Sequence, residues 1–170
     1  MHWYTGKGDE GETSLFGGER APKDDPRIEA LGDLDEATCA IGLVRASTRC
    51  ETDKALLLHI QQQLSVLMAE VASPSTGRCS VTVDATMLAH LEEEISRLQA
   101  RVAPLHDFIF PGATVDSAGY DFARAVVRRA ERRVVHLHHL QLLQNPCALR
   151  YVNRLSSLLF LLARAEEQGK

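Results

Sequence analysis

The stretch "VDSAGYDFARAVVRRAERRVVHLHHLQLL" (residues 115–143) decides the fold of this chain. Apolar residues recur in it at helical spacing on several sides; they are Ala123, Val126, Val127, Ala130 and Val134. A helix with apolar surface nearly all round lies at the centre of a bundle or is covered by another subunit. The stretch therefore predicts a long central helix, from about Val115 to about Leu143.

Four other segments carry the same helical period, and each begins at or near a helix-starting residue or ends before a helix breaker. The expected helices are about 26–47, about 52–72, one after the cap Asp84 with a stripe reaching Val102, and one after Asn145-Pro146. No strand-like alternation competes with them. The sequence predicts an all-α, five-helix bundle as a single domain over residues 1–170, with a loop at 1–25 and the bundle at 26–170.

Composition restricts the classes of function. The chain has 170 residues, 45% of them hydrophobic and 25% charged, with a net charge of −4. A negative net charge argues against nucleic acid or an anionic membrane as a partner. The longest clean apolar run, 158–163, is far shorter than a membrane span. The cysteines show no C-x-x-C pairing, so they fit free thiols in a reducing cytosol, and a cytoplasmic location is expected.

The segment "GKGDEGET" (residues 6–13) matches two phosphate-binding patterns, and neither interpretation holds. Gly6, Gly8 and Gly11 spell G-x-G-x-x-G, but that dinucleotide fingerprint needs a βαβ unit around it. The phosphate-loop pattern G-x-x-x-x-G-x-T has Glu12 in the place of its lysine and no strand before it. Both fingerprints are rejected.

The chemistry of the segment still favours an anion. Glycines let the backbone adopt angles that turn successive amides toward one point. Hydroxyl groups come from Thr5, Thr13 and Ser14, and positive charge from Lys7 and Lys23. The alternative is a flexible polar terminus. Composition alone leaves both interpretations open.

Charged residues also stand on the expected helices. Arg124, Arg128 and Glu131 fall at i, i+4 and i+7, so they share one face of the central helix. Asp35 borders the apolar stripe of the first helix, and Asn153 stands among apolar residues of the last. A charged row on a packed helix must be paired or must meet a ligand. The alternative is that "RRAERR" is a solvated surface stripe.

Three blocks of the chain, taken together, resemble one known family. They are "YTGKGDEGETSLFGGERAPKDDPRIEALGDLDEATCAIG" (4–42), "FIFPGATVDSAGYDFARAVVRRAERRV" (108–134) and "YVNRLSSLLFLLAR" (151–164). This combination is similar to the PduO-type ATP:cob(I)alamin adenosyltransferases. The resemblance implies a ferritin-like five-helix bundle that forms a homotrimer, with ATP bound between subunits.

The resemblance also implies the site residues. The loop 1–25 would bind the nucleotide, and the residues around the triphosphate would be Thr5, Gly6, Gly8, Thr13, Ser14 and Lys23. Arg128, Glu131 and Asn153 would complete the nucleotide and Mg²⁺ site, with Glu131 as the metal ligand. Asp35 and Arg124 match an intersubunit ion pair. Phe108 matches the aromatic residue below the corrin ring; the alternative is a core phenylalanine that closes the bundle end.

The implied reaction needs no protein nucleophile. Cobalt of cob(I)alamin attacks the 5′ carbon of ATP, giving adenosylcobalamin and triphosphate. The protein positions the reactants and stabilises the leaving charge, so Asp35, Arg124, Phe108 and Arg128 form the expected catalytic set. A reductase and a B12-dependent acceptor enzyme are the expected further partners.

Three positions depart from the family pattern. Thr38, Ala113 and Ser157 stand where the family usually has Asn, Gly and Asp. These changes leave the ATP half of the site largely intact and bear more on the corrinoid half. They keep an alternative open, a non-catalytic carrier or regulator that binds ATP or a corrinoid. A purely structural helical oligomer is disfavoured by the glycine-rich loop and the arginines.

Overall fold

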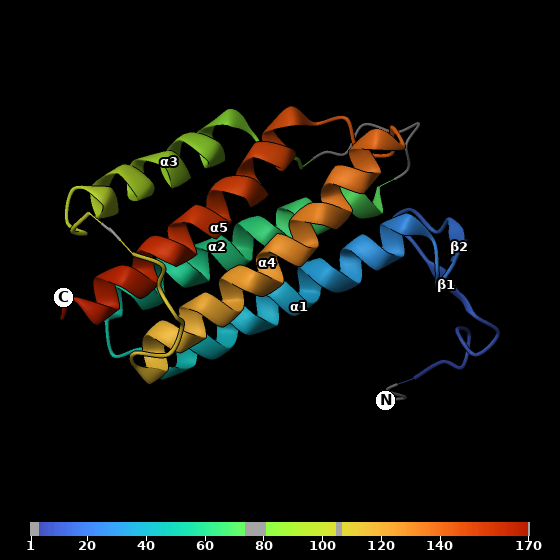
Figure 1. Cartoon of the computed structure of the whole chain (residues 1–170). Coiled ribbons are helices and arrows are strands. Elements are labelled where there is room, and N and C mark those ends of the chain that lie inside the picture. Colours follow the sequence, from blue (N-terminus) through green and yellow to red (C-terminus); the bar gives the residue numbers. More distant parts are fainter. Residues whose placement is uncertain (1–3, 74–80, 105–106, 170) are drawn as a thin grey trace.

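The computed structural model describes residues 4–73, 81–104 and 107–169. These residues form five helices and two short strands (Figure 1). The elements are β1 (Glu12–Ser14), β2 (Arg20–Pro22), α1 (Pro26–Ser47), α2 (Glu51–Ala72), α3 (Ala85–Gln99), α4 (Val115–His139) and α5 (Pro146–Glu167). The predicted all-α, five-helix bundle is confirmed, and its helices begin within one residue of the expected positions.

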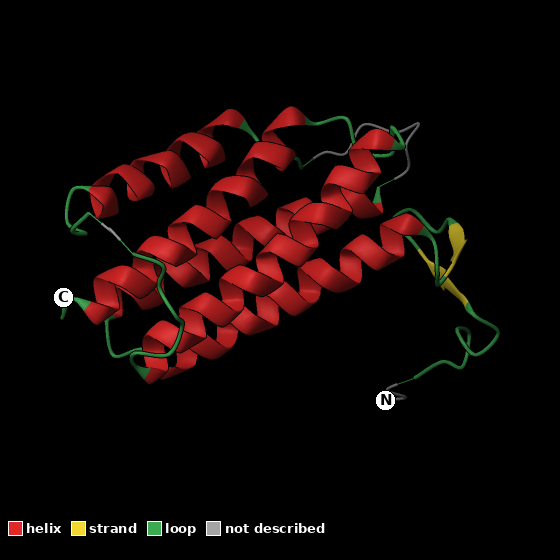
Figure 2. Ribbon diagram, viewed as in Figure 1, coloured by secondary structure: helices red, strands yellow, loops and turns green. Residues whose placement is uncertain are grey.

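Helix α4 is the central helix of the bundle, as its apolar pattern predicts. It packs against α1 on one side and α5 on the other, while α2 packs on α1 and α3 on α5 (Figures 1 and 2). Its buried side chains include Ala123, Val127, Ala130 and Val134. Part of its surface stays open in the single chain, since Phe122 is 55% exposed.

Helix α4 ends at His139, about one turn before the expected Leu143. The cause is local, because Gln141 adopts φ 59° and the amides of Leu142 and Leu143 bond to the carbonyl of Leu137 at 2.9 and 3.4 Å. A left-handed residue just after a helix satisfies its last carbonyls and stops it. Leu143 is nevertheless buried, so the apolar period continues beyond the helix itself.

The N-terminal segment differs from the expected loop because it contains an antiparallel hairpin. Strands β1 and β2 pair with Thr13 opposite Ala21. Leu15 and Ala21 are 5% and 2% exposed, and the Phe16 amide bonds to the Ala72 carbonyl at 3.0 Å. Strands of three residues are too short to show an apolar period, so the sequence pattern missed them. In Figure 1 the hairpin extends past one end of the bundle.

Asp25 joins this hairpin to α1 as its N-cap. Its Oδ1 accepts a hydrogen bond from the Arg27 amide at 2.8 Å, and a side-chain bond from Arg27 lowers the pKa of Asp25. We expect Asp25→Ala to lower the free energy of unfolding by about 1 kcal/mol at neutral pH. Because the folded-state pKa is the lower one, this contribution is complete above the ordinary carboxyl pKa. The contribution is lost as the pH falls through the pKa of Asp25 in the folded state.

Urea unfolding of both proteins at neutral and strongly acidic pH measures this effect. The difference between wild type and variant should shrink in acid. Asp24→Ala is the matched control, since Asp24 is exposed and does not cap the helix. An equal difference at both pH values would show that the carboxylate charge does not carry the effect.

Candidate functional site

The glycine-rich loop is shaped by two left-handed residues. Gly6 and Gly11 have φ values of 68° and 85°, a region that side chains disfavour. The amides of Asp9 and Gly11 close turns onto the carbonyls of Gly6 and Gly8 at 3.1 and 3.3 Å, so these two amides are not free for an anion. A Cβ on Gly8 would lie 3.3 Å from Nζ of Lys23, which places this ammonium directly against the loop.

An open cavity of about 600 Å³ lies inside this loop. Its lining residues are Gly6, Lys7, Asp9, Glu10, Ser14 and Arg20. Thr5 stands at its edge, where its hydroxyl accepts a bond from the Lys7 amide at 3.4 Å. Thr13 is half-buried on β1 next to Ser14. The loop residues expected around a triphosphate are therefore gathered in one small region.

A second group of expected residues lies along α4 and α5. Arg124 and Arg128 line a cavity of about 390 Å³ together with Ser157 and Phe160. One turn further along α4, Glu131 Oε1 accepts a hydrogen bond from Asn153 Nδ2 at 2.8 Å. The Oδ1 of Asn153 in turn accepts from Arg154 at 2.9 Å, which fixes the amide orientation. Arg128, Glu131 and Asn153 thus share one seam between two helices.

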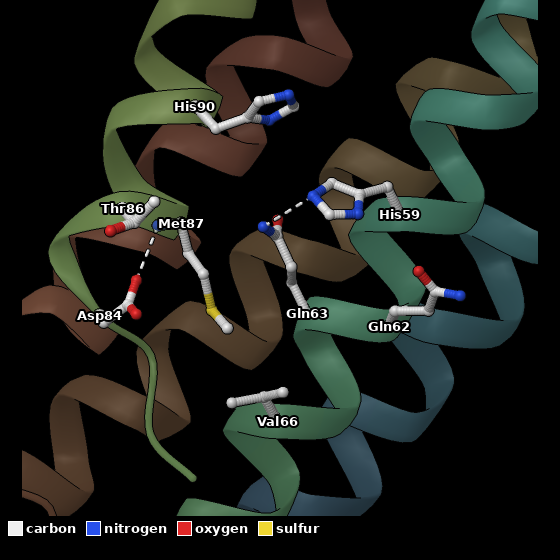
Figure 3. A pocket seen from close by; sticks show the side chains of 8 residues that line it. All are labelled: His59, Gln62, Gln63, Val66, Asp84, Thr86, Met87 and His90. Atoms are coloured by element: carbon white, nitrogen blue, oxygen red, sulfur yellow. Dashed lines mark hydrogen bonds between the residues drawn. The ribbon is translucent and has the colours of Figure 1, made fainter.

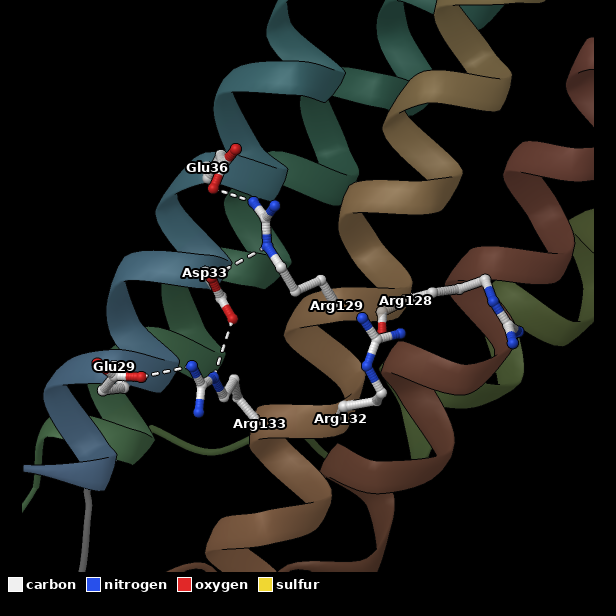
Figure 4. Close-up of polar contacts among 7 residues, drawn as sticks. All are labelled: Glu29, Asp33, Glu36, Arg128, Arg129, Arg132 and Arg133. Atoms are coloured by element: carbon white, nitrogen blue, oxygen red, sulfur yellow. Dashed lines mark hydrogen bonds and ion pairs between the residues drawn. The ribbon is translucent and has the colours of Figure 1, made fainter. Parts of the chain in front are cut away.

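The run "RRAERR" divides into two classes of arginine. Two members form a ladder of ion pairs with acidic residues of α1, shown in Figure 4: Arg129 and Arg133 with Glu29, Asp33 and Glu36. Arg128 and Arg132 point away from this ladder, and among the residues that the structure describes neither pairs with a carboxylate. Both side chains are exposed, so the solvated stripe and a ligand site remain the two interpretations of Arg128 and Arg132.

Arg124 has a partner that the sequence did not reveal. Its Nε donates a hydrogen bond to Asp121 Oδ1 at 3.0 Å, and Asp121 also forms an ion pair with Arg164. The Asp121 side chain is 5% exposed and the Arg164 side chain is 1% exposed. Within the described part of the chain, no hydrogen bond engages the terminal nitrogens of Arg124. Asp35 lies exposed on α1 and does not meet Arg124 in the same chain. The intersubunit pairing of Asp35 with Arg124 stays a prediction.

Phe108 lies on the surface, so the interpretation as a core phenylalanine is wrong. It is 82% exposed and Phe110 is 81% exposed. Their rings meet edge to face, with centroids 5.2 Å apart and an interplanar angle of 75°. Val115, at the start of α4, is 84% exposed. Exposed apolar groups of this kind mark a binding surface.

The two halves of the expected site lie at different places in the chain. Figure 1 shows the hairpin beside the start of α1 and the loop that enters α4 at the opposite end of the bundle. No hydrogen bond or ion pair between described residues joins the glycine-rich loop to the Arg128 seam.

A different groove, between α2 and α3, holds none of the expected residues (Figure 3). It has a volume of about 390 Å³, and the His59 and His90 rings meet across it with centroids 5.1 Å apart. Gln63 accepts a bond from Tyr151 Oη at 2.7 Å and lies 3.0 Å from His59 Nε2. Burial raises the pKa of Tyr151. Over the described ranges, no group of three or more metal-binding side chains gathers.

None of the described helices is both long and apolar enough to span a lipid bilayer.

Comparison with known proteins identifies relatives over almost the whole chain. The family described as cobalamin adenosyltransferase matches residues 3–166. The chain is 43% identical over 169 residues to the corrinoid adenosyltransferase PduO of Salmonella typhimurium, covering 98% of this chain and 50% of that protein. It is 41% identical over 166 residues to a corrinoid adenosyltransferase of Citrobacter freundii, covering 96% and 94%. The chain thus spans about half the length of the PduO relatives and nearly all of the shorter one.

Solved structures agree with this assignment. A variant PduO-type ATP:corrinoid adenosyltransferase from Lactobacillus reuteri, complexed with cobalamin and ATP, superposes with a TM-score of 0.89 at 29% identity, covering 97% of this chain and 93% of that one. A second variant of that enzyme, complexed with ATP, gives a TM-score of 0.87 at 31% identity, covering 97% and 94%. The chain belongs to the cobalamin adenosyltransferase family.

Proposed function

We propose that the protein transfers the 5′-deoxyadenosyl group of ATP to the cobalt of cob(I)alamin, giving adenosylcobalamin and triphosphate. One observation carries the proposal: the chain presents a glycine-rich loop whose cavity is lined by Lys7, Arg20 and Ser14 beside Asp9 and Glu10, and it presents a pair of exposed aromatic rings. The first suits a triphosphate, and the second suits the apolar face of a corrin. The relatives are named for this activity, and one solved relative binds both substrates.

The roles of the residues follow from the reaction. Co(I) is itself the nucleophile, so the new cobalt–carbon bond forms as the bond from C5′ to the triphosphate oxygen breaks. The protein must hold the two substrates in line and stabilise the leaving triphosphate. Lys23 beside Gly8 and Arg128, which pairs with no carboxylate among the described residues, are suited to the negative charge. No side chain needs to be deprotonated to start the reaction.

Phe108 acts on the other substrate. A ring that is 82% exposed can lie against a flat ligand without rearrangement of the core. Since it offers no lone pair to cobalt, it can exclude water from the lower axial position. Removal of that ligand favours reduction of Co(II) to Co(I), which prepares the nucleophile.

Mg²⁺ would enter with the nucleotide. It binds proteins through one or two carboxylates and completes its shell with phosphate oxygens and water. Glu131 supplies one carboxylate, held by Asn153 at 2.8 Å, and this single hard ligand fits a metal that ATP carries. We assign Glu131 as its ligand, where the cation would offset the charge of the triphosphate.

We propose a cytoplasmic homotrimer with sites between subunits. In this assembly the glycine-rich loop of one protomer would meet the Arg128 seam of the next; within one chain, no hydrogen bond between described residues joins the two groups. Asp35 of one protomer would bind the terminal nitrogens of Arg124 of the next. Apolar side chains that the chain leaves open, Leu43 at 64% and Phe122 at 55% exposure, would be covered by the neighbour.

The decisive experiment follows the cob(I)alamin absorbance of purified protein with ATP and a chemical reductant. We expect an ATP-dependent conversion to adenosylcobalamin. Binding of ATP or corrinoid without conversion would instead indicate the carrier or regulator. Light scattering should give the mass of a trimer, and Asp35→Asn should weaken it. A stable monomer at micromolar concentration would contradict the shared site.

A further inference from the structure

Arg20 connects three separate points of the glycine-rich loop. From the start of β2, its Nη2 donates to the Lys7 carbonyl at 3.0 Å. Its Nε and Nη2 donate to Glu12 Oε2 at 3.3 and 3.2 Å, and Nη1 donates to Ser14 Oγ at 3.4 Å. The same side chain lines the 600 Å³ cavity beside Gly6. Neither the phosphate-binding patterns nor the implied site residues include it.

The geometry requires an arginine. A guanidinium carries five N–H donors in a planar fork, so one side chain can bind a carbonyl, a carboxylate and a hydroxyl at once. A lysine at this position would keep the charge but could not span the three acceptors in fixed directions. Because Ser14 and Lys7 both line the cavity, the bonds from Arg20 fix the Lys7 backbone carbonyl and the Ser14 hydroxyl beside it.

The pairing also explains Glu12. Its carboxylate occupies the position where a phosphate loop has lysine, and it would repel a triphosphate if it faced the cavity unpaired. Arg20 holds Glu12 at 3.2 Å, and Glu12 does not line the cavity. The ion pair neutralises one of three acidic side chains near the cavity, since Asp9 and Glu10 also line it.

We infer that Arg20 is a positioning residue of the nucleotide site. It holds Lys7 and Ser14 toward the cavity and neutralises Glu12, so that the loop is arranged before ATP arrives. The inference rests on the proposed function, since it takes the cavity as the triphosphate site. It concerns loop geometry, which can be measured without nucleotide.

The test compares Arg20→Gln and Arg20→Lys with wild type. We expect both variants to raise the Kd for MgATP roughly tenfold, the size expected from losing one or two charge-assisted hydrogen bonds. The KM for cob(I)alamin and the melting temperature should stay unchanged, since the Arg20 side chain is 41% exposed and outside the core. Arg150→Gln is the matched control, an exposed arginine paired with Glu92 on the bundle surface.

Hydrogen exchange of amides 7–14 without nucleotide provides the second measurement. Exchange should become faster in both variants. Faster exchange with unchanged ATP affinity would overturn the inference, because Arg20 would then order the loop without serving the site. Full ATP affinity in Arg20→Lys would overturn it too, since charge alone would suffice. If wild type itself fails to bind MgATP, the proposed function fails, whatever the variants show in exchange.

Discussion

Asp121→Ala is expected to lower the free energy of unfolding by about 3–5 kcal/mol, the cost of breaking a buried ion pair by removing one partner. Asp121 is 5% exposed and Arg164 is 1% exposed. Without the carboxylate, the Arg164 guanidinium stays buried, and Glu167, 3.0 Å away, is its one remaining acidic partner within the described ranges. Arg124 would also lose the only carboxylate with which it forms an ion pair among the described residues.

Urea unfolding at a fixed protein concentration measures this loss, because the apparent stability of an oligomer depends on concentration. Glu92→Ala is the matched control. Glu92 also pairs with two arginines, Arg150 and Arg154, but it is 39% exposed, so its loss should cost less than about 1 kcal/mol. Asp121→Asn should destabilise too, since it removes the charge and keeps the volume. Equal small losses at Asp121 and Glu92 would show that burial does not strengthen the pair.

The helices could be predicted because their signals are local. The three expected N-caps are confirmed: the side chains of Asp25, Asp84 and Asn145 each accept a hydrogen bond from a backbone amide in the first turn of their helix. Failures occurred where the local signal is absent or misleading. The hairpin strands are shorter than one apolar repeat, and the buried Leu143 extends the α4 pattern past a turn at Gln141.

The site could be predicted only where its residues share an element or a motif. Helical spacing placed Arg124, Arg128 and Glu131 on one face. Asn153 stood out among apolar residues, the resemblance gave it a role beside Glu131, and the two side chains do form a hydrogen bond. The partners of charged groups come from long-range packing, which periodicity does not encode. Asp121 meets Arg164 from 43 residues away. Arg20 reaches back across a hairpin whose strands no pattern indicated.

Phe108→Ala is expected to reduce turnover from Co(II) corrinoid on the order of 100-fold, comparable to the effect of misplacing a reacting group by an ångström. The physical reason lies in the proposed role of Phe108, in which the apolar ring would exclude an axial ligand whose presence disfavours Co(I). The melting temperature should hardly change, because an 82% exposed ring contributes little to the core. The affinity for ATP should also be kept, since the glycine-rich loop lies at the other end of the chain's bundle (Figure 1).

Starting the reaction from chemically reduced Co(I) separates the two roles that Phe108 could have. If the ring acts by displacing the axial ligand, supplying Co(I) directly should restore most of the lost rate. If the ring only holds the corrin in place, both starting states should be impaired equally. Phe110→Ala is the matched control: it removes an equally exposed ring from the same loop and breaks the same aromatic pair. Equal losses in the two variants would assign the effect to the aromatic pair, whereas a loss confined to Phe108→Ala would assign it to the Phe108 ring alone.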